Sequence, residues 1–182
     1  MWDQMHTLET CGLGYMASNM TISYYSSMDD STTTTTVAEL VELVKQFRFT
    51  ENLQTITYMQ ATSSPFEKPI LESAGELCRS NKIASPKKRT FIYYFHSKGA
   101  SQFTEDWRLK CYQDSAYCNI LYWRKYLEFF LIEKPTLCLE AFLENDAYTC
   151  GVNLHNEPSW HYNGNFWAAS CDYVSRLPTE TS

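Results

Sequence analysis

The segment FIYYFHSKGAS, residues 91–101, changes character halfway along its length. Its first five residues are apolar and aromatic, which is typical of a buried β-strand. His96, Lys98 and Gly99 then follow within four positions. In open α/β sheets, ligands bind beyond the carboxyl ends of the strands. The segment therefore predicts a strand that ends at a binding site.

Length and charge limit the number of domains and the classes of partner that this protein can have. The chain has 182 residues, a mass of 21.2 kDa and a net charge of -6, so we expect one domain spanning residues 1–182. Its basic residues are scattered apart from Lys87-Lys88-Arg89, which argues against a nucleic-acid partner. No apolar run approaches the roughly 20 residues of a membrane helix, and the N-terminus lacks the features of a signal peptide. We expect a soluble chain without a membrane segment, in the cytoplasm, or in the Golgi lumen if an anchor lies upstream.

The cysteine spacing disfavours a zinc or thiol enzyme. The seven cysteines are residues 11, 78, 111, 118, 138, 150 and 171. They form no CxxC pair and no Cys/His cluster at zinc spacing, so we expect mostly buried, reduced thiols. The alternative is a secreted or Golgi protein with one or two disulfides. Asn19-Met20-Thr21 is a glycosylation sequon, but a single tripeptide of this kind occurs easily by chance.

Strand-like and helix-like segments alternate along the chain. Strands are predicted at residues 21–26, 54–60, 90–97, 148–154 and 164–170. Helices are predicted over the first dozen residues, from Val37 to Phe47 with Thr36 as cap, and over residues 70–81, 114–131, 135–145 and 171–177. Residues 29–36, DDSTTTTT, are a low-complexity loop insertion. The alternation predicts an α/β domain with a mostly parallel central sheet flanked by helices.

The residues after the third predicted strand suit a phosphorylated ligand. Lys98 can pair with a phosphate, His96 can donate to an oxyanion or act as acid or base, and Gly99 lets the backbone approach a ligand. A purely structural interpretation is that His96 is a hydrogen-bonded residue at the edge of the core and Lys98 a solvated turn residue. These residues alone favour that simpler interpretation.

A second segment, SWHYNGNFWAAS, residues 159–170, combines aromatic rings with polar groups. Stacking on ring faces and hydrogen bonds to hydroxyls are the chemistry of sugar recognition. The candidate sugar contacts are His161, Asn163, Gly164, Asn165 and Trp167. Aromatic residues in a strand are more often core residues, but core packing does not explain the histidine and the two asparagines. The two interpretations are evenly balanced here.

Seven segments in order across nearly the whole chain carry a resemblance to one family. They are DQMHTLETCGL (3–13), PFEKPIL (65–71), YYFHSKG (93–99), WRKYLE (123–128), CGVN (150–153), HYNGNFWAA (161–169), and Tyr173 with Leu177-Pro178. The chain resembles glycosyltransferase-like domains with the GT-A, or nucleotide-diphosphosugar transferase, fold. The resemblance implies a GT-A-like sheet, a nucleotide sugar donor, and a glycan or other hydroxyl acceptor.

The departures from the family pattern are also specific. Asn163 and Ala168 stand where the family has serine and a second tryptophan. The family also has a nucleotide-binding strand before its first landmark helix, so we expect that strand to be missing here. Either the sequence is truncated at its N-terminus, or the protein has lost binding of the donor.

The metal ligands of GT-A enzymes are also absent from the sequence. Asp-x-Asp does not occur. Glu144-Asn145-Asp146 has a suitable spacing but follows a predicted helix, and Asp29-Asp30 adjoins the threonine run; both are interpreted as surface charges. HSKG takes the place of the carboxylate motif in the order of strands, which predicts cationic neutralisation of the diphosphate. Mn²⁺ or Mg²⁺ stays possible as a cofactor, without named ligands.

The resemblance assigns roles as follows. His96, Lys98 and Gly99 would face the donor diphosphate, and the 161–167 group would contact the sugar or the acceptor. Asp172 and Asp106 are the candidates for a general base. Arg124 and Glu128 lie four residues apart in a predicted helix and are expected to form a structural ion pair.

Two functions follow from these expectations. The first is a transferase that moves a hexose-type residue from a nucleotide-diphosphate donor to a hydroxyl acceptor, provided that the full-length protein has the missing strand. The alternative is a non-catalytic carbohydrate-binding or interaction module derived from the same fold.

Overall fold

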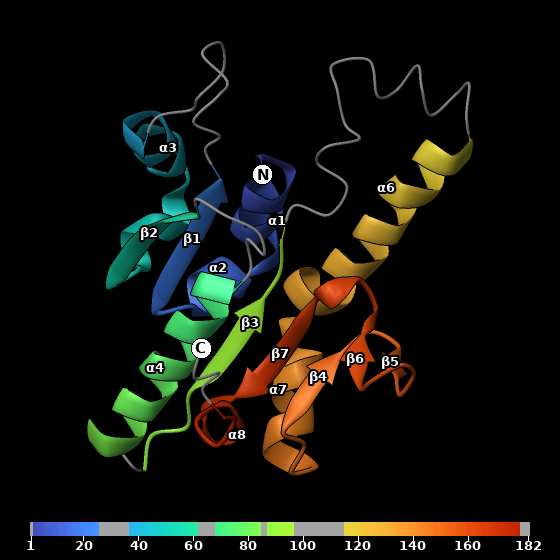
Figure 1. The fold of residues 1–182 in the computed structure, drawn as a ribbon. Helices are drawn as coiled ribbons and strands as arrows, with labels where there is room; N and C mark the ends of the chain where they lie inside the picture. Colours follow the sequence, from blue (N-terminus) through green and yellow to red (C-terminus); the bar gives the residue numbers. More distant parts are fainter. Residues whose placement is uncertain (1, 26–36, 62–67, 85–86, 97–114, 179–182) are drawn as a thin grey trace.

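A computed structural model describes residues 2–25, 37–61, 68–84, 87–96 and 115–178. Within these ranges the chain is a mixed α/β protein with small sheets (Figure 1). The predicted alternation of strands and helices is confirmed. No helix in these ranges combines the length and the apolar character that crossing a bilayer requires.

The N-terminal part is built on a parallel pair of strands. Strand β1 (Asn19–Tyr25) pairs with β2 (Thr55–Ala61), with Asn19 opposite Thr55 and Tyr25 opposite Ala61. Parallel neighbours require a crossover connection, and this one contains a helix and a 3₁₀ turn. The surrounding elements are α1 (Trp2–Cys11), α2 (Leu13–Met16), α3 (Val37–Val44) and η1 (Arg48–Asn52). The expected cap Thr36 and the 29–36 insertion lie outside the described residues.

The second sheet is antiparallel, which corrects the expectation of a mostly parallel central sheet. The strand order is β3-β7-β4, and both pairings are antiparallel. Its strands are β3 (Phe91–Tyr94), β4 (Thr149–Gly151) and β7 (Trp167–Ser170). Between β4 and β7 the chain forms a hairpin and a turn instead of a crossover helix, so it returns in the opposite direction. The hairpin and turn are β5 (Leu154–His155), β6 (His161–Tyr162) and η4 (Asn163–Asn165).

The helices match the sequence expectations with small changes at their ends. The predicted helix over residues 114–131 becomes α6 (Ser115–Glu128) followed by a π-helical turn, η3 (Phe129–Glu133). Pro135 then begins α7 (Pro135–Glu144), where its missing N–H costs nothing. The remaining helices are α4 (Lys68–Ala84) and α8 (Cys171–Val174).

One apolar core joins α1, the parallel strands, η3 and α7. The apolar spacing predicts one stripe on the first helix, made of Met5, Leu8, Cys11 and Leu13. Met5, Leu8 and Leu13 are buried, whereas Cys11 is only partly buried. Phe166, at the start of β7, and Leu127 of α6 are completely buried in the same cluster. The core therefore holds the amino end of β7 firmly against α6.

A charged group lies within this core. Glu128 has no exposed surface, and its two carboxylate oxygens lie 3.4 Å from Arg124 Nε and 3.2 Å from Lys125 Nζ. Arg124 also donates to Asp3 Oδ2 across 2.6 Å, which connects α6 to α1. The expected ion pair between Arg124 and Glu128 is confirmed. The buried pair lies within α6, and its link to α1 is the ion pair from Arg124 to Asp3, whose side chain is 63% exposed.

The expectation of mostly reduced cysteines is wrong. Disulfides connect Cys78 to Cys171 and Cys138 to Cys150, and Cys118 is also disulfide-bonded. The first disulfide joins α4 to the start of α8 across 93 residues of sequence, and the second joins α7 to β4. The sequence analysis considered only closely spaced cysteines such as CxxC. The cysteines of these disulfides come together only in the folded chain, so the pairings could not be predicted in that way. Cys11 is a free thiol.

The two described disulfides should stabilise the fold to different extents. In the chain-entropy account, a loop of about 100 residues gains about 4.7 kcal/mol and one of about 15 residues about 3 kcal/mol. We expect the Cys78→Ser/Cys171→Ser variant to lose more free energy of unfolding than Cys138→Ser/Cys150→Ser, as measured by urea unfolding. Cys11→Ser is the control and should change stability little. Equal losses in both double variants would contradict this account.

Candidate functional site

The carboxyl end of β3 meets the turn that precedes β7. Because β3 and β7 are antiparallel and Tyr94 lies opposite Trp167, the residue that follows the end of β3 comes beside the residues that precede β7. His96 Nε2 lies 2.9 Å from the carbonyl oxygen of Gly164. This contact joins the two segments that the sequence singled out, 68 positions apart. We name His96, Gly164, Asn165, Trp167 and the adjoining Trp123 the His96 site.

The contacts of His96 determine how its ring can act. A carbonyl oxygen only accepts hydrogen bonds, so Nε2 must carry the proton and donate to Gly164. In the neutral ring, Nδ1 then keeps a lone pair that can accept a hydrogen bond or a proton. The ring packs against Phe166 with 5.3 Å between centroids, and Gln4 Nε2 of α1 donates to the His96 carbonyl across 2.8 Å. His96 is therefore held in one orientation while remaining partly exposed.

The turn at Gly164 depends on the absence of a side chain. Gly164 has φ +69° and Asn165 has φ +56°, in the left-handed region. A Cβ atom at Gly164 would lie 2.4 Å from Leu127 Cδ1 and 3.0 Å from Trp123 Nε1. The backbone conformation thus favours glycine, and the close approach to α6 leaves no space for a side chain unless Leu127 moves.

Trp123 belongs to this site although the sequence did not single it out as a ligand contact. Its indole nitrogen lies beside Gly164, and 39% of the residue is exposed. The sequence signal was present, since Trp123 begins the WRKYLE segment, but helical spacing alone does not say which residue of α6 faces the turn. The structure places an exposed tryptophan beside Gly164, the residue whose carbonyl His96 contacts.

Asn165 and Trp167 are brought to the site but already contact each other. Trp167 Nε1 donates to Asn165 Oδ1 across 3.2 Å, and the Trp167 ring stacks on Tyr94 with centroids 5.1 Å apart. One face of Trp167 is therefore occupied by protein. Asn163 is fixed through its backbone N–H, which donates to the Val152 carbonyl across 3.0 Å.

His161 lies on the β5–β6 hairpin instead. It is exposed, its ring stacks on His155 with 5.6 Å between centroids, and its Nδ1 lies 2.7 Å from the Ser159 carbonyl. The predicted sugar contact of His161 thus comes from a separate element. Lys98, Gly99 and Asp106 lie outside the described residues, as do Asp29 and Asp30.

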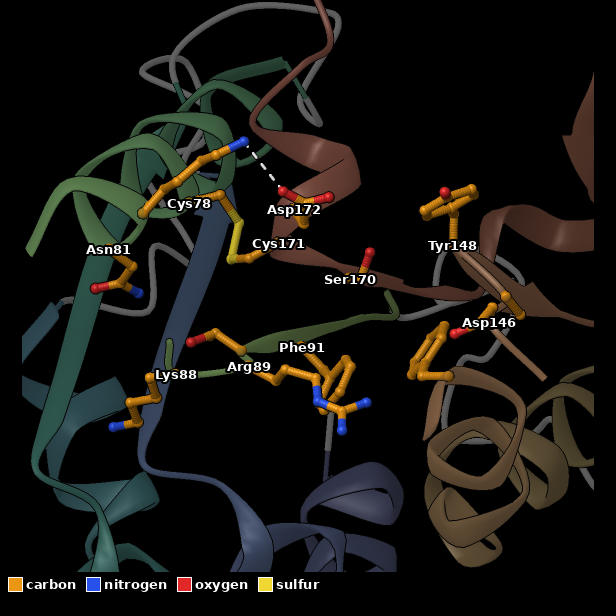
Figure 2. A pocket seen from close by; sticks show the side chains of 14 residues that line it. Cys78, Asn81, Lys88, Arg89, Phe91, Asp146, Tyr148, Ser170, Cys171 and Asp172 are labelled. Carbon is orange, nitrogen blue, oxygen red and sulfur yellow. Dashed lines mark hydrogen bonds and ion pairs between the residues drawn. A yellow bond between two sulfur atoms is a disulfide. The ribbon is translucent and has the colours of Figure 1, made fainter. Parts of the chain in front are cut away.

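Asp172 lies at the opposite end of the β3–β7 ladder from His96. Ser170 pairs with Phe91, the first residue of β3, so Asp172 is placed at the amino end of that strand. It lines a pocket of about 510 Å³ with Lys88, Arg89 and Tyr148 (Figure 2). With about 3.3 Å per residue, the length of β3 separates this pocket from His96. Asp172 and His96 therefore lie at different ends of this strand.

The ion pairs of Asp172 also make it a weak base. Lys82 Nζ donates to Asp172 Oδ1 across 3.0 Å, and Arg176 bonds the other oxygen. The hydrogen bond from Lys82, aided by the charge of Arg176, lowers the pKa of the Asp172 carboxyl. The role of Asp172 as a general base remains a prediction that these contacts do not favour.

The described residues do not assemble a metal centre. Within the described ranges, no three His, Cys, Asp or Glu side chains gather at a distance that could hold an ion. Asp146 lines the Asp172 pocket and Glu144 ends α7, and both are exposed.

The steric role of Gly164 can be tested against a second glycine. Gly164→Ala should destabilise the fold by about 2–4 kcal/mol, because left-handed strain adds to a clash with Leu127. Gly12 is the matched control: it has φ +89°, but a Cβ atom at this position would meet nothing within 4 Å. Gly12→Ala should cost only about 1–2 kcal/mol in urea unfolding. Equal losses of free energy of unfolding in the two variants would show that the clash with Leu127 of α6 adds nothing to the cost of the substitution.

Comparison with known proteins gives a family without a described activity. Residues 2–180 match the model of a domain of unknown function, DUF8361. No curated protein and no solved structure matches the chain. Because the match covers nearly the whole length, the chain belongs to the DUF8361 family.

Proposed function

We propose that this chain is a GT-A-like glycosyltransferase domain that binds a nucleotide sugar at the His96 site and transfers its hexose-type sugar to a hydroxyl acceptor. One observation carries the proposal. The two segments whose motifs resemble that family are joined by the contact between His96 Nε2 and the Gly164 carbonyl, at the carboxyl end of β3.

The chemistry of the His96 site suits an oxygen-rich ligand. With Nε2 bound to Gly164, the Nδ1 atom of His96 accepts a hydrogen bond from a sugar hydroxyl when neutral and donates to a phosphate when protonated. The partly exposed ring of Trp123 offers an apolar face for a pyranose. Lys98, two residues further along the chain, would neutralise the diphosphate.

The non-catalytic module remains the second candidate, and a specific observation favours it. Asp172, a candidate general base, is held in ion pairs at the far end of the β3–β7 ladder from His96. The β3-β7-β4 pairings are also compatible with either function, since fold alone does not determine activity. Turnover therefore has to be measured separately from binding.

The first experiment measures binding and turnover on the same sample. The purified chain is heated with a panel of nucleotide sugars, with and without Mn²⁺, and a donor that binds the folded state raises its melting temperature. Release of nucleoside diphosphate in the presence of a glycan acceptor then separates a transferase from a module. A folded sample that no donor stabilises would overturn both the transferase and nucleotide-sugar binding.

His96→Ala tests the site directly. We expect it to weaken binding of the stabilising donor about tenfold, the equivalent of one hydrogen bond of about 1.4 kcal/mol. His155→Ala is the matched control, because it removes an exposed histidine from the hairpin. Calorimetric titration measures both.

A folding defect must be distinguished from a binding defect. His96→Gln offers an amide donor toward the Gly164 carbonyl and should hold the turn better than alanine does. If His96→Ala melts at a much lower temperature and His96→Gln restores both stability and affinity, the residue is structural. A well-folded His96→Ala variant that binds the donor with unchanged affinity would also contradict the proposed role of His96 in donor binding.

A further inference from the structure

The sequon Asn19-Met20-Thr21 lies at the start of β1, with its polar residues in solvent. Asn19 and Thr21 are exposed, whereas Met20 is half-buried and Ile22 is buried. Alternate residues of a strand point to the same face, so Asn19 and Thr21 share the outer face of β1. No other Asn-x-Ser/Thr tripeptide occurs in the 182 residues.

The face that carries Asn19 is unusual for parallel strands. Parallel sheets are normally covered on both faces. Here, Thr55 and Thr57 lie opposite Asn19 and Thr21 in the β1–β2 register, and all four residues are exposed. The opposite face supplies apolar residues to the core: Met20, Ile22, Tyr24, Ile56 and Tyr58. The amino end of this pair therefore presents exposed polar side chains, and the core residues lie on the other face.

The disulfides provide an independent indication of the same chemistry. Cys78–Cys171 and Cys138–Cys150 are structural bonds between separate elements. Such bonds persist in oxidising compartments, where secreted and luminal proteins mature, and are rare in the cytosol. Sequons are modified along that same secretory route. A sequon in a cytosolic protein is not glycosylated. The disulfides indicate an oxidising compartment, in which this sequon can be glycosylated.

We propose that Asn19 is an N-glycosylation site and that the domain matures in an oxidising secretory compartment. The glycan would cover the polar face formed by Asn19, Thr21, Thr55 and Thr57. This proposal does not depend on the transferase activity proposed above, because it concerns a modification of the chain and not its ligand.

The modification is a group transfer from a polyprenyl-diphosphate-linked oligosaccharide, catalysed by the membrane oligosaccharyltransferase of the host cell. A bond forms between Asn19 Nδ2 and the anomeric carbon, while the bond from that carbon to the phosphate oxygen breaks. The polyprenyl diphosphate leaves with the electron pair, and Nδ2 loses one proton. The Thr21 hydroxyl completes the sequon that the transferring enzyme recognises.

The test is expression of the full chain behind a secretion signal in a eukaryotic cell. Total protein, retained and secreted, is treated with peptide N-glycosidase under denaturing conditions. We expect one discrete decrease in mass, and conversion of Asn19 to aspartate in the corresponding peptide. Asn19→Gln and Thr21→Ala should abolish the decrease, and Thr21→Ser should retain it as the matched control.

Thiol alkylation of the same sample checks the compartment. Cys78, Cys171, Cys138 and Cys150 should resist alkylation until a reductant is added, whereas Cys11 should react in the denatured protein at once. An unmodified Asn19 in the chain that has formed these disulfides would overturn the glycosylation site. Free thiols at these four positions would overturn the secretory assignment.

Discussion

The close approach of the Gly164 turn to α6 is the constraint on which the His96 site depends. A side chain at residue 164 would overlap Leu127, and the Gly164 carbonyl is the group to which His96 donates. The same turn therefore faces a packed helix on one side and an oriented histidine on the other. Phe166 anchors it, because it is completely buried two residues later. The short segment 164–166 thus determines both the packing against α6 and the hydrogen bond from His96.

The helix beneath this turn is itself held by charge. Glu128, one residue after Leu127, is buried against Arg124 and Lys125, and Arg124 extends the contact to Asp3 of α1. Gln4, the neighbour of Asp3, donates to the His96 carbonyl. The amino-terminal helix thus supports the site through two adjacent residues. A buried ion pair is weak evidence for stability, because desolvation of the two charges offsets their attraction.

The two ends of the β3–β7 ladder have different chemistry. At one end are His96 and aromatic rings, with hydrogen bonds inside the protein. At the other end, Lys82 and Arg176 form exposed ion pairs with Asp172, which directly follows Cys171 of the Cys78–Cys171 disulfide (Figure 2). Exposed ion pairs of this type contribute little stability, so the disulfide provides the stronger constraint on that end.

The local structure of this protein could be predicted from its sequence. Apolar spacing predicted the helices and the buried stripe of Met5, Leu8 and Leu13, and aromatic composition located β3 and the segment that contains β7. These features depend on neighbours along the chain, which a sequence displays directly. The motifs also identified His96 and Gly164 as members of one site, without showing the contact between them.

The direction of the strands, the pairing of the cysteines and the grouping of the site residues required the folded chain. The hairpin between β4 and β7 reverses the chain, and this reversal places Trp167 beside Tyr94, two residues before His96, and Asp172 beside Lys82. Composition cannot reveal it, because antiparallel and parallel strands use the same residue types. Contacts such as Trp123 with Gly164, or Cys78 with Cys171, join residues far apart in sequence, and their distances are set by the packing of the whole core.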